Sequence, residues 1–490
     1  MSASTIDTQP RIVAEQAALP LCVDLDGTLI HSDMLHEGLC ALVTDPRSLQ
    51  ILPQLFRGRA AFKEAVAARV PVEPELLPFN ETLLAYLRAQ KKAGRYLVLA
   101  TAADRSVACA VAECVGLFDE VIASDGTDNL KGAAKARALV ARFGPRGFCY
   151  AGNAHSDLAV WREAAAAIVV NAPSGVLARA RSQGPVELTI DNRPAVFREL
   201  LKAARPHQWI KNVLVFVPIL TAHALHDVSA WIAAALMFAA FCCTASGIYL
   251  INDMLDIRAD RLHPRKRMRP FARGAIALPL GALAALALIC AGVVLSQLVH
   301  VAWIIVLYAL MSISYSLRLK ELPLVDVFML AALYTIRVFG GGEATHHRLS
   351  LWLLGFSSFL FLSLALLKRT AEMMSVAKSG NTKAARRGYD ASDMPILQLF
   401  GIAAAFAASI VMALFVQSEA NAEHYASPSV LWLTVPLLLF WACRMWMAGS
   451  RGNMHHDPII YAARDRVSWV IGIAVVIVLV AAKSLIYLPK

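Results

Sequence analysis

The C-terminal part of the chain contains nine apolar segments, and these restrict its fold more than any other feature. They lie at about 213–225, 229–250, 276–297, 300–315, 324–342, 350–367, 394–417, 428–447 and 467–487. A helix needs roughly 20 apolar residues to cross a bilayer, and shorter segments can cross when they extend into their flanks. The sequence therefore predicts an all-α bundle of nine transmembrane helices within residues 205–490.

Basic residues are distributed unevenly among the loops between these segments. The loops at 251–275, 316–322, 368–393 and 448–466 carry seven, two, six and three Lys/Arg, whereas the alternate loops carry a single one, in 343–349. Loops rich in Lys and Arg stay in the cytoplasm. The pattern predicts a multi-pass inner-membrane protein whose N-terminal domain and basic loops are cytoplasmic and whose C-terminus lies outside.

The charge of the chain divides at the same place. Residues 1–200 carry a net charge of −1 and residues 201–490 carry +12, out of +11 for all 490 residues. This asymmetry predicts a soluble domain followed by a basic membrane domain, and it does not favour nucleic-acid binding. We expect a disordered lead at 1–18, a soluble domain at 19–185, a linker at 186–204 and the membrane domain at 205–490. The lead lacks the pattern of a signal peptide.

An acidic motif follows the first apolar strand of the soluble domain. The strand runs into Asp24-Leu25-Asp26-Gly27-Thr28, which resembles the first motif of the haloacid dehalogenase superfamily. The resemblance implies a Rossmann-like α/β fold in which Asp24 is the nucleophile that accepts a phosphoryl group. Asp26, two residues further on, would be the general acid and base.

Further motifs of that superfamily follow in the expected order. Thr101 ends a second strand and matches the phosphate-binding threonine; Lys135 matches the phosphate-balancing lysine, with Lys131 as the alternative. A third strand precedes Asn153 and Asp157. Helical sequence between His36 and Gln90 is consistent with a cap over the site.

Asn153 stands where the superfamily usually has aspartate. Asp24 and Asp157 remain as carboxylate ligands for Mg²⁺, beside Asp26 and Asn153, so one carboxylate is missing from the expected set. Weaker metal binding and loss of activity would each follow from this change. The two readings of the domain are a phosphatase and a retained fold that regulates or scaffolds the membrane half.

The membrane half carries its own acidic motif in residues 252–274. Asp253, Asp256 and Asp260 are spaced so that one helical face would present all three, next to seven Lys/Arg that include Lys266 and Arg269. Mg²⁺ prefers a few carboxylates together with phosphate oxygens. A metal–diphosphate site explains the acids, whereas a cytoplasmic loop that only sets membrane orientation explains just the bases.

The sequence NDMLDIRAD, residues 252–260, is similar to the first aspartate-rich motif of the UbiA superfamily of membrane prenyltransferases. Several further sequences resemble its decaprenylphosphate phosphoribosyltransferase branch: RPHQWIKN, YSLRLKELPLVDV, KRTAE and DPIIYAARDR. At the second motif Asp326 has Leu330 four residues on, where the family usually has another aspartate. The second metal site is therefore expected to have fewer carboxylate ligands.

The resemblance implies roles for individual residues. Mg²⁺ on the pyrophosphate of the donor would be held by Asn252, Asp253, Asp256 and Asp260, with Asp253 and Asp256 catalytic and Asp326 at the second site. Substrate phosphates would be bound by Lys211, Asn212, Lys266, Arg269, Tyr315, Lys320 and Arg337.

The reaction implied is transfer of phosphoribose from a soluble diphosphate donor, phosphoribosyl pyrophosphate, to a polyprenyl phosphate. The N-terminal domain would then act on the product as a phosphatase. The alternative enzymatic function is transfer of a prenyl group from a prenyl diphosphate to an aromatic acceptor. The non-enzymatic alternative is a membrane transporter or an anchored scaffold.

Overall fold

The computed structural model describes the chain except residues 1–4, 9–17, 44–47, 126–127, 348, 379–387, 419–424, 455–456 and 485–490. The chain forms two compact units. The first consists of Met1–Ala204 with Tyr249–Ala284, and the second of Arg205–Ile248 with Ala285–Lys490. Tyr249–Ala284 thus interrupts the second unit in sequence and belongs to the first.

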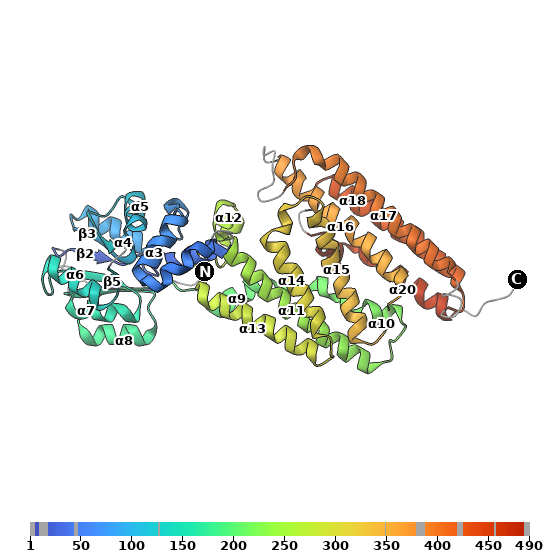
Figure 1. Cartoon of the computed structure of the whole chain (residues 1–490), viewed down its shortest axis with the longest axis horizontal. Coiled ribbons are helices and arrows are strands. Elements are labelled where there is room, and N and C mark those ends of the chain that lie inside the picture. The colour runs from blue at the N-terminus through green and yellow to red at the C-terminus, as the bar shows by residue number, and fades with distance from the viewer. Residues whose placement is uncertain are drawn as a thin grey trace. The chain divides into compact units, whose positions relative to one another are not determined.

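A sheet of seven described strands forms the centre of the first unit (Figure 1). Its order is β1-β7-β6-β5-β2-β3-β4, and every neighbouring pair is parallel except β1 with β7. The strands are β1 Thr5–Thr8, β2 Leu21–Val23, β3 Leu97–Asp104, β4 Glu120–Ser124, β5 Cys149–Gly152, β6 Ala166–Val170 and β7 Val186–Asp191.

Alternation along the central strands builds a core on each face of the sheet, because successive side chains point to opposite faces. Leu21 and Leu97 belong to one core, and Cys22, Val98 and Tyr150 to the other. The first core is covered by α4 Glu81–Lys92 and α5 Arg105–Val115; the second by α6 Ala133–Phe143, α7 Leu158–Glu163 and α8 Ser174–Gln183. Two covered faces and parallel strands confirm the predicted Rossmann-like α/β fold.

Helices between β2 and α4 form the cap beside the sheet. They are α2 Met34–Val43, η1 Ser48–Arg57, α3 Arg59–Arg69 and η2 Pro74–Leu76. Leu42, Ile51 and Val66 make a small core of their own. The predicted cap extended to Gln90, but α4 belongs to the sheet layer, since its Leu83 and Leu87 are buried in the sheet core.

The structure differs from the predicted disordered lead at residues 5–8. These residues form β1, which pairs antiparallel with β7 from Thr5↔Asp191 to Thr8↔Leu188. Pairing with a strand far along the sequence orders this segment, and no local pattern reveals it. Residues 1–4 and 9–17 of the predicted lead lie outside the described residues.

The second unit is helical. It begins with η4 Pro206–Phe216 and α10 Val217–Thr221, and α11 Val228–Leu255 runs from it into the first unit. The long helices that follow are α13 Leu278–Gln297, α14 Ala302–Leu317, α15 Val325–Ala344, α16 Leu351–Lys378, α17 Met394–Gln417, α18 Thr434–Ser450 and α20 Arg466–Ser484. Short elements of this unit are η6 Leu319–Glu321, η7 Ala391–Asp393, η9 Pro428–Leu433 and α19 Pro458–Arg464. The short helices α12 Ile257–Leu262 and η5 Lys266–Met268 lie in the segment that belongs to the first unit.

Seven helices in the described part of the chain are long and apolar enough to cross a membrane, where the sequence predicted nine. The predicted span at 300–315 forms α14, an apolar helix of 16 residues. The predicted span at 213–225 instead falls on the end of η4 and on the five-residue helix α10. The predicted helical bundle is confirmed, with two fewer spans of full length.

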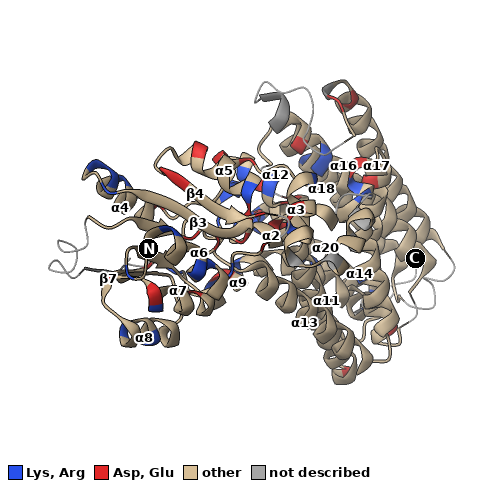
Figure 2. Ribbon diagram, turned by 60° about the vertical axis from the view of Figure 1, so that its left-hand side comes forward, with Lys and Arg blue, Asp and Glu red and all other residues tan. Residues whose placement is uncertain are grey.

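The long helices bury one side and expose apolar side chains on the other. Phe361, Leu367 and Trp446 lie in the main helical core, whereas Leu283 and Ile477 are more than half exposed. In Figure 2, α13 and α14 show no charged residue. Apolar outward surfaces on helices are what a lipid environment requires, so the chain is a multi-pass membrane protein.

Candidate functional sites

The loop after β2 presents the first acidic pair. Asp24 accepts a hydrogen bond from the backbone N–H of Leu25 (2.9 Å), and Asp26 accepts one from the N–H of Met34 (2.9 Å). Gly27, directly after Asp26, has φ +71°, and a Cβ there would collide with the amide of Asn153. Only glycine fits this turn without strain, and the turn holds both carboxylates.

A buried network connects the motifs of the α/β unit. Lys135 Nζ lies 2.8 Å from Asp24 Oδ1 and donates a hydrogen bond of 2.8 Å to the hydroxyl of Tyr150. That hydroxyl donates to Asp157 (3.3 Å), whose other oxygen accepts from the backbone N–H groups of Asn153 and Ala154. Lys135, the preferred lysine of the sequence analysis, is the one that contacts Asp24.

The two aspartates of the first motif have different electrostatic surroundings. Burial raises the pKa of Asp24, while the Lys135 ammonium opposes the shift. Burial, helped by the carboxylate of Asp33, raises the pKa of Asp26 to about 7. A carboxyl group with a pKa near neutrality can both give and take a proton, as the predicted general acid and base must.

Thr101 and Lys63 complete this edge of the sheet. Thr101 is fully buried within β3, which continues to Asp104 instead of ending at Thr101 as the sequence predicted. Its hydroxyl accepts a hydrogen bond from the N–H of Ala103 (3.0 Å). Lys63, from the cap helix α3, donates to the carbonyl of Ala102 (2.6 Å) and to Asn129 Oδ1 (3.2 Å). The sequence analysis missed Lys63, since nothing along the chain links a cap lysine to β3.

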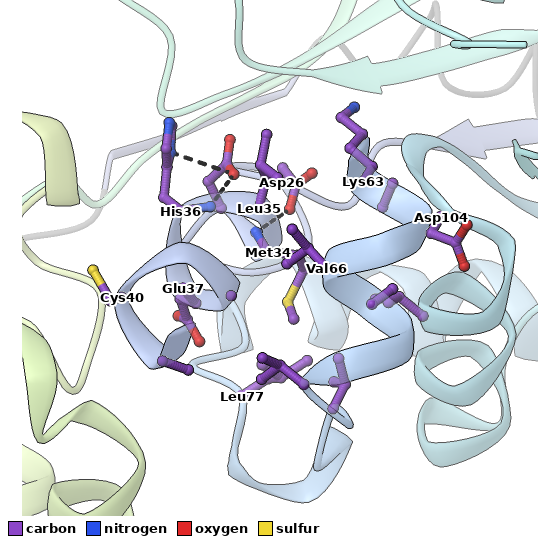
Figure 3. Close-up of a pocket in the computed structure, with 18 of the residues that line it drawn as sticks. Asp26, Met34, Leu35, His36, Glu37, Cys40, Lys63, Val66, Leu77 and Asp104 are labelled. Carbon is purple, nitrogen blue, oxygen red and sulfur yellow. Dashed lines mark hydrogen bonds and ion pairs between the residues drawn. The ribbon is translucent and has the colours of Figure 1, made fainter. Parts of the chain in front are cut away.

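A cavity of about 490 Å³ opens beside Asp26 in the first unit (Figure 3). Figure 3 places Asp26, His36 and Lys63 on one side and Leu77 on the opposite side. Its walls come from α2, α3, α5 and the segment that carries the second acidic motif, through Met254, Leu255, Ile257, Arg258 and Arg261. The cavity has the size of a small-molecule site.

The acidic motif at 252–260 does not lie on one continuous helix. α11 ends at Leu255, Asp256 leaves helical geometry (φ −97°, ψ 11°), and α12 begins at Ile257. The predicted single helix is therefore interrupted at Asp256, although Asp253 and Asp260 still lie close enough together to contact one guanidinium group. Side-chain spacing alone cannot reveal a helix break at one residue.

Arg269 joins the two outer acids of this motif. Its Nη1 lies 2.8 Å from Asp260 Oδ2 and 3.3 Å from Asp253 Oδ1, and both carboxylates are buried. Burial raises the pKa of Asp260, which Arg269 and the exposed Lys266 oppose. Acids and bases predicted to handle one diphosphate thus contact each other directly.

The oxygen atoms of this motif suit Mg²⁺, which prefers carboxylate and amide oxygens. Asn252 adds a buried Oδ1 that has no hydrogen-bond partner among the described residues. As placed, no three His, Cys, Asp or Glu side chains in the described part of the chain converge closely enough to hold a metal ion.

In the second unit two lysines converge on one carboxylate. Asp457 Oδ2 lies 2.7 Å from Lys211 Nζ and 3.3 Å from Lys368 Nζ, and the hydroxyl of Tyr334 donates to the same oxygen at 2.9 Å. Burial lowers the pKa of Lys211 to about 8, although Asp457 opposes the shift. Burial favours a raised pKa for Asp457, but the two ammonium groups outweigh it and lower that pKa well below its usual range.

Arg337 lies next to this cluster. Its Nε donates to Asn212 Oδ1 (2.7 Å), and its Nη2 donates to the hydroxyl of Tyr308 (3.0 Å). The Lys211 ammonium and the Arg337 guanidinium each lie 5.8 Å from the ring centre of Tyr334. The structure thus brings together three predicted residues, Lys211, Asn212 and Arg337.

Asp326 is bound by a cation of the protein itself. Arg369 Nη2 lies 2.6 Å from Asp326 Oδ2, and the hydroxyl of Tyr389 donates to Asp326 Oδ1 at 2.5 Å. The sequence analysis predicted Asp326 as a metal ligand. In the structure it lies against Arg369 and Tyr389, in apolar packing that includes Leu330. Without a second carboxylate at 330, a guanidinium compensates the buried charge.

Tyr315 and Lys320 lie at the ends of neighbouring elements. The Tyr315 hydroxyl accepts a hydrogen bond of 3.5 Å from Arg369, and Lys320 lies in η6. The sequence analysis left Asp457 and Lys368 out of the predicted sites. Their signal was only the family-like sequences DPIIYAARDR and KRTAE.

Comparison with known proteins agrees with both folds. Residues 213–386 match the UbiA prenyltransferase family, and residues 21–162 match the haloacid dehalogenase-like hydrolases. An uncharacterized protein of Sinorhizobium fredii is 37% identical over 460 residues, which cover 93% of this chain and 89% of that protein.

Two further relatives match a little more than half of the chain. The nodulation protein NoeC of Azorhizobium caulinodans is 34% identical over 60% of this chain and 94% of its own length. A decaprenyl-phosphate phosphoribosyltransferase of Mycolicibacterium smegmatis is 30% identical over 56% of this chain and 89% of its own length. The chain therefore belongs to the UbiA prenyltransferase family and carries in addition an N-terminal haloacid dehalogenase-like domain.

Proposed function

We propose that the membrane half transfers a phosphoribosyl group from phosphoribosyl pyrophosphate to a polyprenyl phosphate at the cytoplasmic face of the membrane. An oxygen of the lipid phosphate forms a bond to the anomeric carbon, while the bond from that carbon to the pyrophosphate oxygen breaks. Pyrophosphate leaves with its electron pair. The name of the relative from Mycolicibacterium smegmatis supports this choice of transferred group and acceptor.

The observation that carries the proposal is the buried cluster of cations around Asp457. Lys211, Lys368 and Arg337 bring three positive charges against the single negative charge of Asp457. A net positive, largely buried cluster favours an anionic ligand, because a buried charge needs a partner. A charged acceptor such as a lipid phosphate suits it better than a neutral aromatic one.

Asn252, Asp253, Asp256 and Asp260 would hold Mg²⁺ in this proposal. The bound metal would stabilise the negative charge on the departing pyrophosphate. Arg269, already in contact with Asp253 and Asp260, would bind a phosphate oxygen and orient the donor. The residues around Asp457 would bind and orient the phosphate of the acceptor.

The N-terminal domain would remove the 5-phosphate of the product. Asp24 would take up the phosphoryl group while Asp26 gives its proton to the leaving oxygen, and water would then release inorganic phosphate. Asp24, Asp157 and Asn153 offer oxygen ligands for Mg²⁺, and Lys135 balances the charge of Asp24. Attachment of both domains to one chain raises the effective concentration of the intermediate.

A labelled-donor assay tests the transferase. Full-length protein in lipid nanodiscs receives phosphoribosyl pyrophosphate labelled in the ribose, polyprenyl phosphate and Mg²⁺. We expect a labelled lipid from the wild type and almost none from Asp253→Asn. A different outcome would overturn the proposal: the lipid stays unlabelled, and the protein instead transfers a prenyl group from a prenyl diphosphate to an aromatic acceptor.

A second arm tests the phosphatase. With labelled lipid product supplied directly, Asp24→Asn should release no inorganic phosphate, while its transferase activity stays at the wild-type level. If the wild type also releases none, the N-terminal domain is a scaffold and only the transferase proposal stands.

A further inference from the structure

The cavity beside Asp26 is polar at one end and apolar along most of its length. Asp26, Asp33, Lys63 and Asn129 supply hydrogen-bonding groups at the end next to the reacting carboxyl. Its other lining side chains are largely aliphatic or aromatic, among them Phe62, Val66, Val70, Leu77, Met254 and Ile257. A ligand that fits this cavity has a polar part next to Asp26 and Lys63 and an apolar part along the remaining walls.

Four of the charged side chains that line the cavity form two ion pairs with each other. Arg261 donates to both oxygens of Glu37, at 2.8 and 2.6 Å, and this pair is largely buried. Arg258 pairs with Glu73. Such mutual pairing leaves a wall that is close to neutral, which suits a hydrocarbon better than a second sugar.

Part of this wall comes from the segment that bears the transferase motif. Met254, Leu255 and Ile257 alternate along the chain with Asp253 and Asp256. All three side chains are apolar and line the cavity, and Met254 and Ile257 are buried. The Arg261–Glu37 pair fixes α12 against the cap helix α2.

We infer that this cavity is a lipid-recognition site of the phosphatase: it binds an amphipathic phosphomonoester, with the sugar beside Asp26 and Lys63 and the first part of an isoprenoid chain between α3 and α12. This rests on the proposed phosphatase function. The residues that select the substrate are then apolar side chains of the cap and of α12, not only the motif residues that bind the phosphate.

Two substrates that differ only in an apolar group test the inference. Full-length protein carrying Asp253→Asn, to silence the transferase, receives ribose 5-phosphate or an octyl riboside 5-phosphate below its critical micelle concentration. Burying about four methylene groups corresponds to on the order of 100-fold in kcat/KM at about 0.8 kcal/mol each. We expect a preference of that order for the octyl compound.

Filling the cavity should abolish the preference. Ala67→Phe on α3 places a ring in the cavity, whereas Ala68→Phe places it on the exposed side of the same helix. We expect Ala67→Phe to reduce the preference to a few-fold with ribose 5-phosphate turnover retained, and Ala68→Phe to leave the preference unchanged. Retained ribose 5-phosphate turnover shows that the domain is folded. Ile257→Ala should lower the preference several-fold and so report the contribution of α12.

The outcomes separate the inference from the function on which it rests. Two outcomes overturn the lipid-recognition site but leave the phosphatase proposal intact. One is equal turnover of the two substrates by the protein with an unaltered cavity, and the other is an undiminished preference in Ala67→Phe. Absence of turnover with either substrate overturns the phosphatase proposal and the inference with it.

Discussion

Arg369 Nη2 lies 2.6 Å from Asp326 Oδ2 inside the helical unit, and neither side chain has any exposed surface. The carboxylate that sequence alone assigns to a second metal thus already has a cationic partner. Removal of either member of such a buried pair is costly, because the other charge is then left isolated in a medium of low polarity.

Removal of that partnership should destabilise the membrane half. We expect Asp326→Asn to lower the free energy of unfolding by about 3–5 kcal/mol, because Arg369 stays buried without its carboxylate. Thermal unfolding in detergent measures the loss. The Mg²⁺ concentration for half-maximal transferase activity should stay unchanged in the protein that remains folded. A rise in that concentration would show that Asp326 does bind metal.

Arg269 and Arg267 provide a matched pair of substitutions for the acidic motif at 252–260. Arg269 contacts Asp253 and Asp260, whereas Arg267 is an exposed neighbour two residues away. We expect Arg269→Ala to reduce kcat/KM for the diphosphate donor by about 100-fold, since a charge-assisted contact is lost near the leaving group. Arg267→Ala should change it by less than about threefold. Equal effects of the two variants would point to the general charge of the loop instead.

The lowered pKa of the buried Lys211 predicts that the KM for the lipid phosphate changes with pH in the alkaline range. Because its pKa is lowered to about 8, Lys211 loses its charge at a lower pH than an ordinary lysine does. The KM for the lipid phosphate should therefore rise as pH increases from about 7 to 9. Lys211→Arg retains the charge over this range, so it should remove this rise in KM. A rise that persists in Lys211→Arg would assign the titration to another group.

Asn153 allows a gain-of-function test in the phosphatase. Its backbone N–H donates to Asp157, and its amide lies against Gly27. We expect Asn153→Asp to lower the Mg²⁺ concentration for half-maximal hydrolysis of ribose 5-phosphate by about tenfold, since Mg²⁺ gains a carboxylate ligand. Without Mg²⁺ the same variant should melt at a lower temperature, because three carboxylates then repel each other. If both quantities stay unchanged, position 153 does not face the metal.

Local chemistry made part of the sites predictable. The pair Asp24 and Asp26 follows a strand directly, and the resemblance to the haloacid dehalogenase superfamily implied Lys135 and Asp157 beside it. The structure places Lys135 against Asp24 accordingly. Apolar segments similarly predict membrane helices, because length and hydropathy are properties of a single segment.

Features that depend on tertiary packing escaped prediction. Lys211 and Asp457 are 246 residues apart in the sequence, and only packing between η4 and α19 brings them together. Asp326 could have paired with any cation of the bundle; its partner Arg369 comes from α16. The break at Asp256 also lacks a proline or glycine that would announce it.

Strand β1 has a practical consequence for work on the phosphatase half alone. Thr5–Thr8 covers one side of β7, whose N–H and C=O groups would otherwise form an open sheet edge. Open edges recruit strands from other molecules. A truncated protein that starts at Leu19 should therefore self-associate during purification, and retention of the first eight residues should keep it dispersed.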